Sequence, residues 1–191
     1  MRIGTSHGTY AYAGKMEAIY SRIRAHGYTA ADHNLSDTNK PWYSSVSEMD
    51  RYCDRVRKAA EENGIFISQI HGPWPTDDTT SENRAKVTEW MRRAVYACAR
   101  MGSRHMVLHP VMPYGWASEE DADVAEKLTV DLLSTLVPTC EKEGVILCLE
   151  NMPMMAHRIS RIPMIVQAVE KVGSPYVGIC LDTGHCNVFG D

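Results

Sequence analysis

The sequence contains no uninterrupted apolar stretch of the roughly 18 residues that a membrane-spanning helix needs. Its first residues, Met1-Arg-Ile-Gly, lack the basic segment followed by an apolar segment that marks a secretory signal. Both absences argue against a membrane partner. We therefore expect a cytoplasmic protein.

The chain also lacks an excess of basic residues, because 20 Lys and Arg face 24 Asp and Glu. A net charge of −4 provides no broad basic face for nucleic acid or an anionic membrane, so neither is expected as a partner. No C-x-x-C pair occurs among the six cysteines, which fall within predicted helices and strands. We expect reduced thiols that pack as small apolar residues.

Short apolar runs are what the sequence does contain, in a chain of 191 residues that suits one domain, residues 1–191, better than two. Runs of this length, rich in Val, Ile and Leu, are typical of strands buried on both faces in a parallel sheet covered by helices. The predicted strands are Arg2–Ser6, Tyr28–His33, Ile65–His71, His105–His109, Val145–Glu150 and Val177–Asp182.

Helical patterns separate several of these strands, over Ser47–Asn63, over Ser81–Met101 and from Ser118 to the residue before Gly144. Gly64 and Gly144 stand where a helix-terminating glycine is expected. The alternation predicts an α/β fold of the TIM (β/α)8 barrel type, with only the first six βα units present in this sequence. Because a closed barrel needs eight strands and about 250 residues, either the chain is part of a longer one or the sheet stays open.

Four predicted strands end in a side chain that can bind a metal or a proton: His71, His109, Glu150 and Asp182, with His185 three residues further on. Taken singly, each histidine is more often a hydrogen-bonded structural residue, and Glu150 could form a buried ion pair. Their corresponding positions in successive βα units instead favour one shared site at the barrel mouth. Carboxylate and imidazole ligands suit a divalent ion such as Zn²⁺, Mn²⁺, Co²⁺ or Mg²⁺.

Other residues near the strand ends are weaker candidates for the pocket wall. His7 and the pair Asp32–His33 end the first two strands, and Asn151 follows Glu150. Trp74 and Trp116 lie in loops, where an aromatic ring either stacks on a sugar or caps the core. Packing, surface or wall positions are expected for the other histidines and a methionine-rich run, namely His26, His105, His157 and Met152–Met155.

At Leu149-Glu150-Asn151 and Leu181-Asp182-Thr183-Gly184-His185 the sequence resembles the xylose isomerase-like TIM barrel superfamily. The strings His71-Gly-Pro and Leu108-His109-Pro support the resemblance, which covers the chain from Arg2 to Asp191 as six βα units. This superfamily includes sugar epimerases and isomerases, inosose dehydratase and endonuclease IV.

The resemblance implies roles for the strand-end residues. In the epimerases and isomerases, the match of Glu150 binds a divalent metal and is one of two acid/base groups, the match of Asp182 binds the metal, and the match of His185 contacts substrate. In endonuclease IV, the matches of all five residues belong to a three-zinc cluster. The family takes a further metal histidine from strand seven and a metal glutamate, the second acid/base group, from strand eight, and both lie beyond the six predicted strands.

We therefore expect a divalent-metal-dependent isomerase or epimerase of a small sugar or keto-polyol, in which Glu150 transfers a proton through an enediolate. A metal-assisted dehydratase would use the same residues. The alternatives are a zinc-dependent abasic-site endonuclease, against which the acidic charge argues, and a catalytically inactive barrel fragment.

Six strands alone would leave the first and last with unpaired backbone groups, each costing about 1 to 3 kcal/mol if buried. We expect these edges to be covered, either by further residues of a longer chain or by another subunit in a homo-oligomer.

Overall fold

The computed structural model describes residues 2–76, 81–115 and 121–190. Six parallel strands form one sheet in the order of the sequence, which confirms the predicted α/β barrel architecture. Their bounds are β1 Gly4–Ser6, β2 Ala30–Asn34, β3 Phe66–His71, β4 His105–Leu108, β5 Ile146–Glu150 and β6 Val177–Cys180. The predicted extension of the last strand to Asp182 is wrong, because Asp182 is the N-cap of the following helix.

The helices are α1 Met16–Ala25, α2 Val46–Glu62, α3 Ser81–Arg100, α4 Ala122–Glu143, α5 Ile162–Val172 and α6 Thr183–Phe189, with 3-10 turns η1 His7–Ala13, η2 Pro41–Tyr43 and η3 Arg158–Ser160. The predictions for α2 and α3 hold to within one residue. The predicted helix start at Ser118 lies outside the described residues, and α4 begins after Asp121, whose side chain accepts a hydrogen bond from the Asp123 backbone. Gly144 ends α4 in the left-handed conformation, as predicted.

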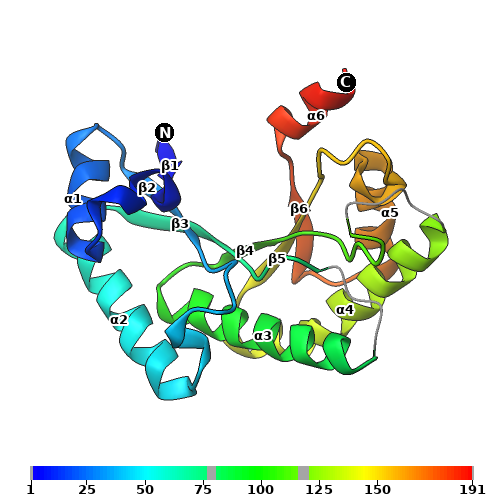
Figure 1. Ribbon diagram of the computed structural model, residues 1–191, viewed down its shortest axis with the longest axis horizontal. Coiled ribbons are helices and arrows are strands. Elements are labelled where there is room, and N and C mark those ends of the chain that lie inside the picture. Colours follow the sequence, from blue (N-terminus) through cyan, green and yellow to red (C-terminus); the bar gives the residue numbers. More distant parts are fainter. Residues whose placement is uncertain (1, 77–80, 116–120, 191) are drawn as a thin grey trace.

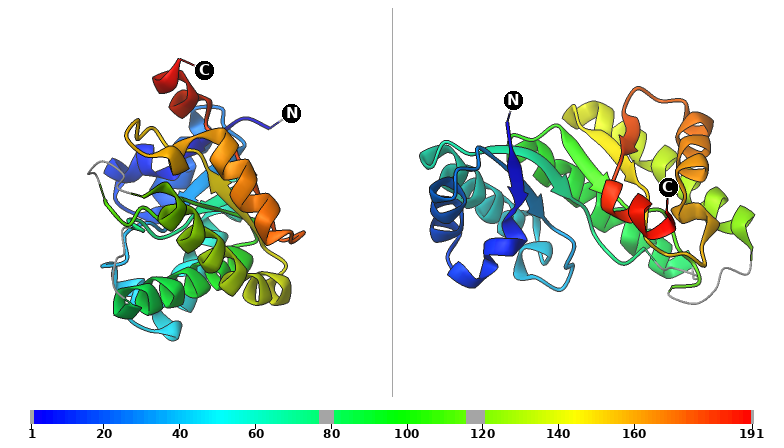
Figure 2. Two further views of the ribbon diagram at one scale, coloured as in Figure 1. Left: turned by 90° about the vertical axis from the view of Figure 1, so that its right-hand side faces the viewer. Right: turned by 90° about the horizontal axis from the view of Figure 1, so that it is seen from above.

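The sheet curves into an open barrel with the helices on its outer side (Figure 1). In the described residues β1 pairs only with β2 and β6 only with β5, and these two strands lie on opposite sides of a gap that further views also show (Figure 2). No described helix combines the length and apolarity required for crossing a membrane.

Side chains alternate between the helical layer and the barrel interior along the central strands. Met106 and Leu108 of β4 and Leu147 and Leu149 of β5 are fully or almost fully buried in the main apolar core. Burying each such side chain contributes about 1.5 to 3 kcal/mol. The intervening residues face inward, so the last inward position of β5 is occupied by Glu150.

A β-bulge interrupts this alternation in β3. Ala31 pairs with Ile67, but the next residue of β2, Asp32, pairs with Gln69, so Ser68 is left as the extra residue. Strict alternation would place His71 on the same face as Ile67, which is buried in the core with the helices. After the bulge it is Ile70 that enters this core, and His71 turns inward beside Val107.

Candidate functional site

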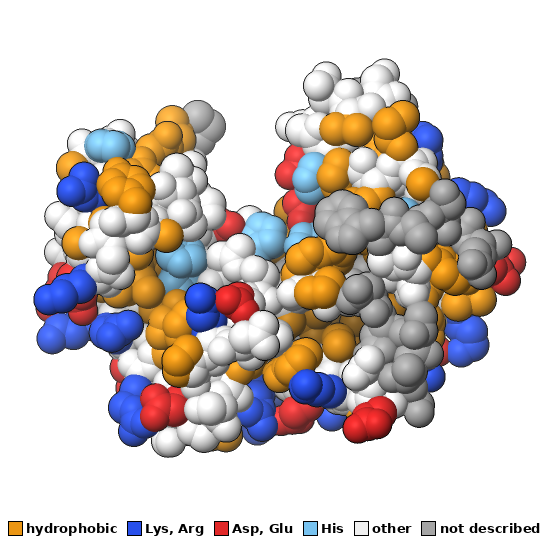
Figure 3. Space-filling model, in the orientation of Figure 1, with side chains coloured by type: hydrophobic (Ala, Val, Ile, Leu, Met, Phe, Trp, Pro, Cys, Tyr) orange, Lys and Arg blue, Asp and Glu red, His pale blue; other side chains and the backbone are white. Residues whose placement is uncertain are grey.

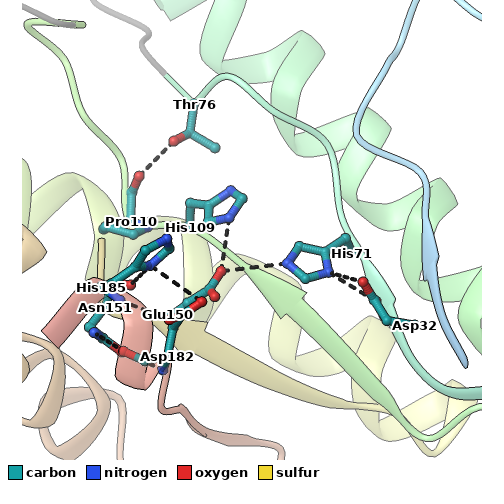
Figure 4. A network of polar contacts seen from close by, with 9 residues as sticks. All are labelled: Asp32, His71, Thr76, His109, Pro110, Glu150, Asn151, Asp182 and His185. Atoms are coloured by element: carbon teal, nitrogen blue, oxygen red, sulfur yellow. Dashed lines mark hydrogen bonds and ion pairs between the residues drawn. The ribbon is translucent and has the colours of Figure 1, made fainter. Parts of the chain in front are cut away.

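Glu150 lies at the centre of the barrel mouth, where it is 4% exposed. It belongs to two groups of side chains whose potential ligand atoms lie within 4.8 Å of one another: His71, His109 and Glu150, and Glu150, Asp182 and His185. The five predicted site residues are therefore brought together at the strand ends (Figure 4). In the space-filling view, histidine and acidic side chains gather in the hollow between the two arms of the molecule (Figure 3).

Two histidine rings approach the same oxygen of Glu150. His109 Nε2 lies 3.0 Å and His71 Nε2 lies 3.5 Å from Glu150 Oε2. This oxygen is buried, yet neither nitrogen is aligned for a hydrogen bond to it. The Nδ1 atom of His109 is also buried without a hydrogen-bond partner in the described part of the chain. Such atoms are close enough to share an ion but are poorly satisfied without one.

Asp32, the middle residue of β2, lies on the other side of the His71 ring. Both of its carboxylate oxygens lie 2.9 Å from His71 Nδ1. Burial by itself would lower the pKa of His71, but the contacts with Asp32 and Glu150 outweigh it and raise the pKa to about 10. Burial likewise opposes ionisation of Glu150, but His109 and His71 lower its pKa to about 2. The shift of His71 follows from the closeness of its ring to the carboxylates of Asp32 and Glu150.

Asn151 organises the side of the site formed by β5 and β6. Its amide nitrogen donates to the Asp182 carbonyl at 2.9 Å, and its amide oxygen accepts the Asp182 backbone N–H at 2.8 Å. The Asn151 carbonyl lies 2.7 Å from His185 Nδ1, and Asp182 accepts the His185 backbone N–H at 2.8 Å. Asn151 is 1% exposed, so the structure places this predicted wall residue behind Asp182 and His185.

The loop after β4 is fixed from two sides next to His109. Thr76 donates a hydrogen bond to the Pro110 carbonyl at 2.6 Å, and the Val111 backbone N–H donates to Thr129 Oγ1 at 2.9 Å. Trp74 stands edge-on to His109, with ring centres 4.7 Å apart. The second predicted loop tryptophan, Trp116, lies outside the described residues.

The residues that end β1 and β2 divide between the pocket and the helical layer. The prediction that His33 lines the pocket is wrong, because strand alternation turns this side chain toward the helices. There it is fully buried between the hydroxyls of Tyr20 and Tyr52. Its pKa lies well below the ordinary value because of burial and the neighbouring His7. His7 stacks on His33 with ring centres 4.0 Å apart and accepts the Asn34 backbone N–H at its Nδ1.

Among the histidines predicted to be packing or surface residues, His157 is buried in the interior. The methionine run divides, because Met152 is buried whereas Met155 is 65% exposed. The contact between Asp32 and His71 and the hydrogen bonds made by Thr76 and Thr129 were not predicted from the sequence. Only the position of Asp32 near a predicted strand end indicated a place in the site. A threonine in a loop or helix has no sequence pattern that would predict such a contact.

The family model described as "Xylose isomerase-like TIM barrel" matches residues 20–191. The chain belongs to this family. Among curated relatives in the family is "Probable endonuclease 4" of Mycoplasma mobile, 25% identical over 159 residues, which cover 83% of this chain and 52% of the relative. The chain thus spans about half the length of that relative.

Solved structures share the family fold over nearly all of this chain. D-psicose 3-epimerase, determined in the presence of D-fructose, gives a TM-score of 0.79 at 20% identity, covering 100% of this chain and 66% of its own. The IOLI protein with a bound zinc atom gives a TM-score of 0.75 at 15% identity, covering 97% and 64%. At these identities the likeness shows the fold.

The chemistry of the donor atoms in this site is suited to a divalent ion. One group offers two imidazoles and a carboxylate, and the other offers two carboxylates and an imidazole. Such nitrogen and oxygen sets are those that borderline ions such as Zn²⁺, Mn²⁺ and Co²⁺ prefer. Glu150, whose Oε2 is buried without an aligned donor, is the residue that both groups share.

Proposed function

We propose that the protein is a divalent-metal-dependent isomerase or epimerase of a small sugar or keto-polyol. The observation that carries this proposal is Glu150, a buried carboxylate shared by two groups of ligand-competent side chains at the barrel mouth. The fold shared with D-psicose 3-epimerase supports the same class of reaction.

Glu150 and Asp182 would hold the ion, with His185 beside them and His71 and His109 as substrate contacts or ligands of a second ion. A bound divalent ion would polarise a substrate carbonyl and so acidify the adjacent C–H. Asp182 is held in place for this by its hydrogen bonds with Asn151.

Glu150 would perform the proton transfer. Glu150 is ionised at neutral pH, and an ion that acidified the carbon beside the carbonyl would let Glu150 accept its proton and return it through an enediolate. The barrel wall around it offers His109 and Trp74, a polar and an aromatic surface suited to sugar hydroxyls and sugar faces.

The test uses ketoses such as D-psicose and D-fructose, the purified protein with Mn²⁺, Co²⁺ or Zn²⁺, and deuterated water. Proton abstraction predicts deuterium incorporation beside the carbonyl, detected by NMR, even where epimerisation itself is slow. Glu150→Gln should abolish the incorporation, whereas Glu61→Gln, which alters an exposed carboxylate on α2, should not. A Glu150→Gln protein that retains full turnover on its substrate would refute the proposal.

An abasic-site endonuclease is the second candidate, favoured by one specific feature. The additional group of His71, His109 and Glu150 offers ligands for more than one ion, and a curated relative is named an endonuclease. The net charge of −4 opposes tight binding to a phosphate backbone. Binding of an abasic duplex with a steep inverse dependence on salt, together with strand cleavage, would favour the nuclease over the isomerase.

A further inference from the structure

We infer that Asp32 is a positioning residue that fixes the ring of His71 so that its Nε2 faces the centre of the metal site. This inference rests on the proposed metal dependence, and it concerns a residue outside both ligand groups. Asp32 acts through His71 and does not itself contact the ion.

The geometry of the pair is the first observation. Both carboxylate oxygens of Asp32 lie 2.9 Å from His71 Nδ1, and the two side chains are only 17% and 21% exposed. A carboxylate accepts hydrogen bonds but donates none, so it fixes the proton of the ring on Nδ1. The opposite nitrogen, Nε2, then points to Glu150 at 3.5 Å, as Figure 4 shows.

The β-bulge in β3 is the second observation, because it is what lets the two side chains meet. Asp32 faces the barrel interior opposite Gln69, and His71 faces it opposite Asn34. Without the extra residue Ser68, alternation would turn His71 into the helical layer, away from Asp32. Bulges of this kind commonly re-aim a side chain next to an active site.

The third observation is a parallel on the other side of the site. His185 Nδ1 likewise faces an acceptor, the Asn151 carbonyl at 2.7 Å, and the same atom lies 3.7 Å from Asp182 Oδ2. Two histidines from opposite sides of Glu150 are thus oriented by an acceptor on Nδ1. Partners of this kind typically change metal affinity by about 10- to 100-fold when removed.

The test is a double-mutant cycle read by equilibrium dialysis and by the visible spectrum of bound Co²⁺. Asp32→Ala should weaken Co²⁺ binding by about 10- to 100-fold, and Asp32→Asn, which keeps an acceptor oxygen, should weaken it less. In a His71→Ala background, Asp32→Ala should have no further effect. Asp131→Asn, which alters an exposed carboxylate on α4, is the matched control and should leave binding unchanged.

Several results would overturn the inference alone: full Co²⁺ affinity in Asp32→Ala or in His71→Ala, or an equal loss from Asp32→Ala with and without His71. If Asp32→Ala does not fold, as judged by circular dichroism, the same cycle is run with Asp32→Asn. Failure of the unaltered protein to bind Co²⁺ would overturn the proposed function and the inference together, so the two failures are distinguishable.

Discussion

The ionised carboxylate of Glu150 should stabilise the metal-free protein through its contacts with His71 and His109, and Glu150→Gln should remove that stabilisation. Gln resembles the protonated acid in shape, so the variant isolates the effect of the charge. The pKa lowered from 4.5 to about 2 corresponds to about 3 kcal/mol at about 1.4 kcal/mol for each pH unit. We expect a loss of this order in the free energy of unfolding at pH 6 to 7, measured by urea denaturation in the presence of a chelator.

The pH dependence of this difference is the sharper part of the prediction. Because the pKa of Glu150 is lower in the folded state than its unfolded value of 4.5, the contribution is fully present above pH 4.5. It is lost as the pH falls toward about 2, where the unaltered protein and Glu150→Gln should become equally stable. A difference in unfolding free energy that stays constant between pH 6 and pH 2.5 would refute the electrostatic reasoning.

Three further predictions concern the surroundings of this carboxylate. Asn151→Ala should lower the free energy of unfolding by about 1 to 3 kcal/mol, because two partly buried hydrogen bonds to Asp182 are lost. Unchanged urea denaturation would contradict this. Affinity for Co²⁺ should rise between pH 6 and pH 8, because His71, with a pKa of about 10, must lose a proton before its Nε2 can bind an ion. An affinity that does not change with pH would show that His71 is not a ligand. In the native assembly the outer edges of Gly4–Ser6 and Val177–Cys180 should be paired with further backbone, so amide hydrogen exchange there should be slow. Fast exchange at these edges in a stable monomer of these 191 residues would refute the prediction.

Local sequence signals were sufficient for the order of the strands. Apolar runs such as Ile146–Glu150 can be satisfied only when both faces are buried, and Gly144 permits the left-handed turn that ends α4. The helices α1 and α5, which begin without a side-chain cap, were missed, and so was the short α6, although Asp182 caps it. The stability of α1 and α5 comes from packing on the sheet, which a local pattern does not report.

The positions of the five metal-competent residues at or just after strand ends were enough to predict that they share one mouth, because parallel strands place their carboxyl ends together. It did not determine which way the side chains near those ends point. The bulge at Ser68 reverses the faces of Ile70 and His71, and alternation sends Asp32 into the barrel but His33 into the helical layer. A shift of one residue in strand pairing hardly changes the local sequence pattern, but it exchanges the two faces of the strand. The contact between Asp32 and His71, residues from two strands, was therefore decided only when the strands packed into one sheet.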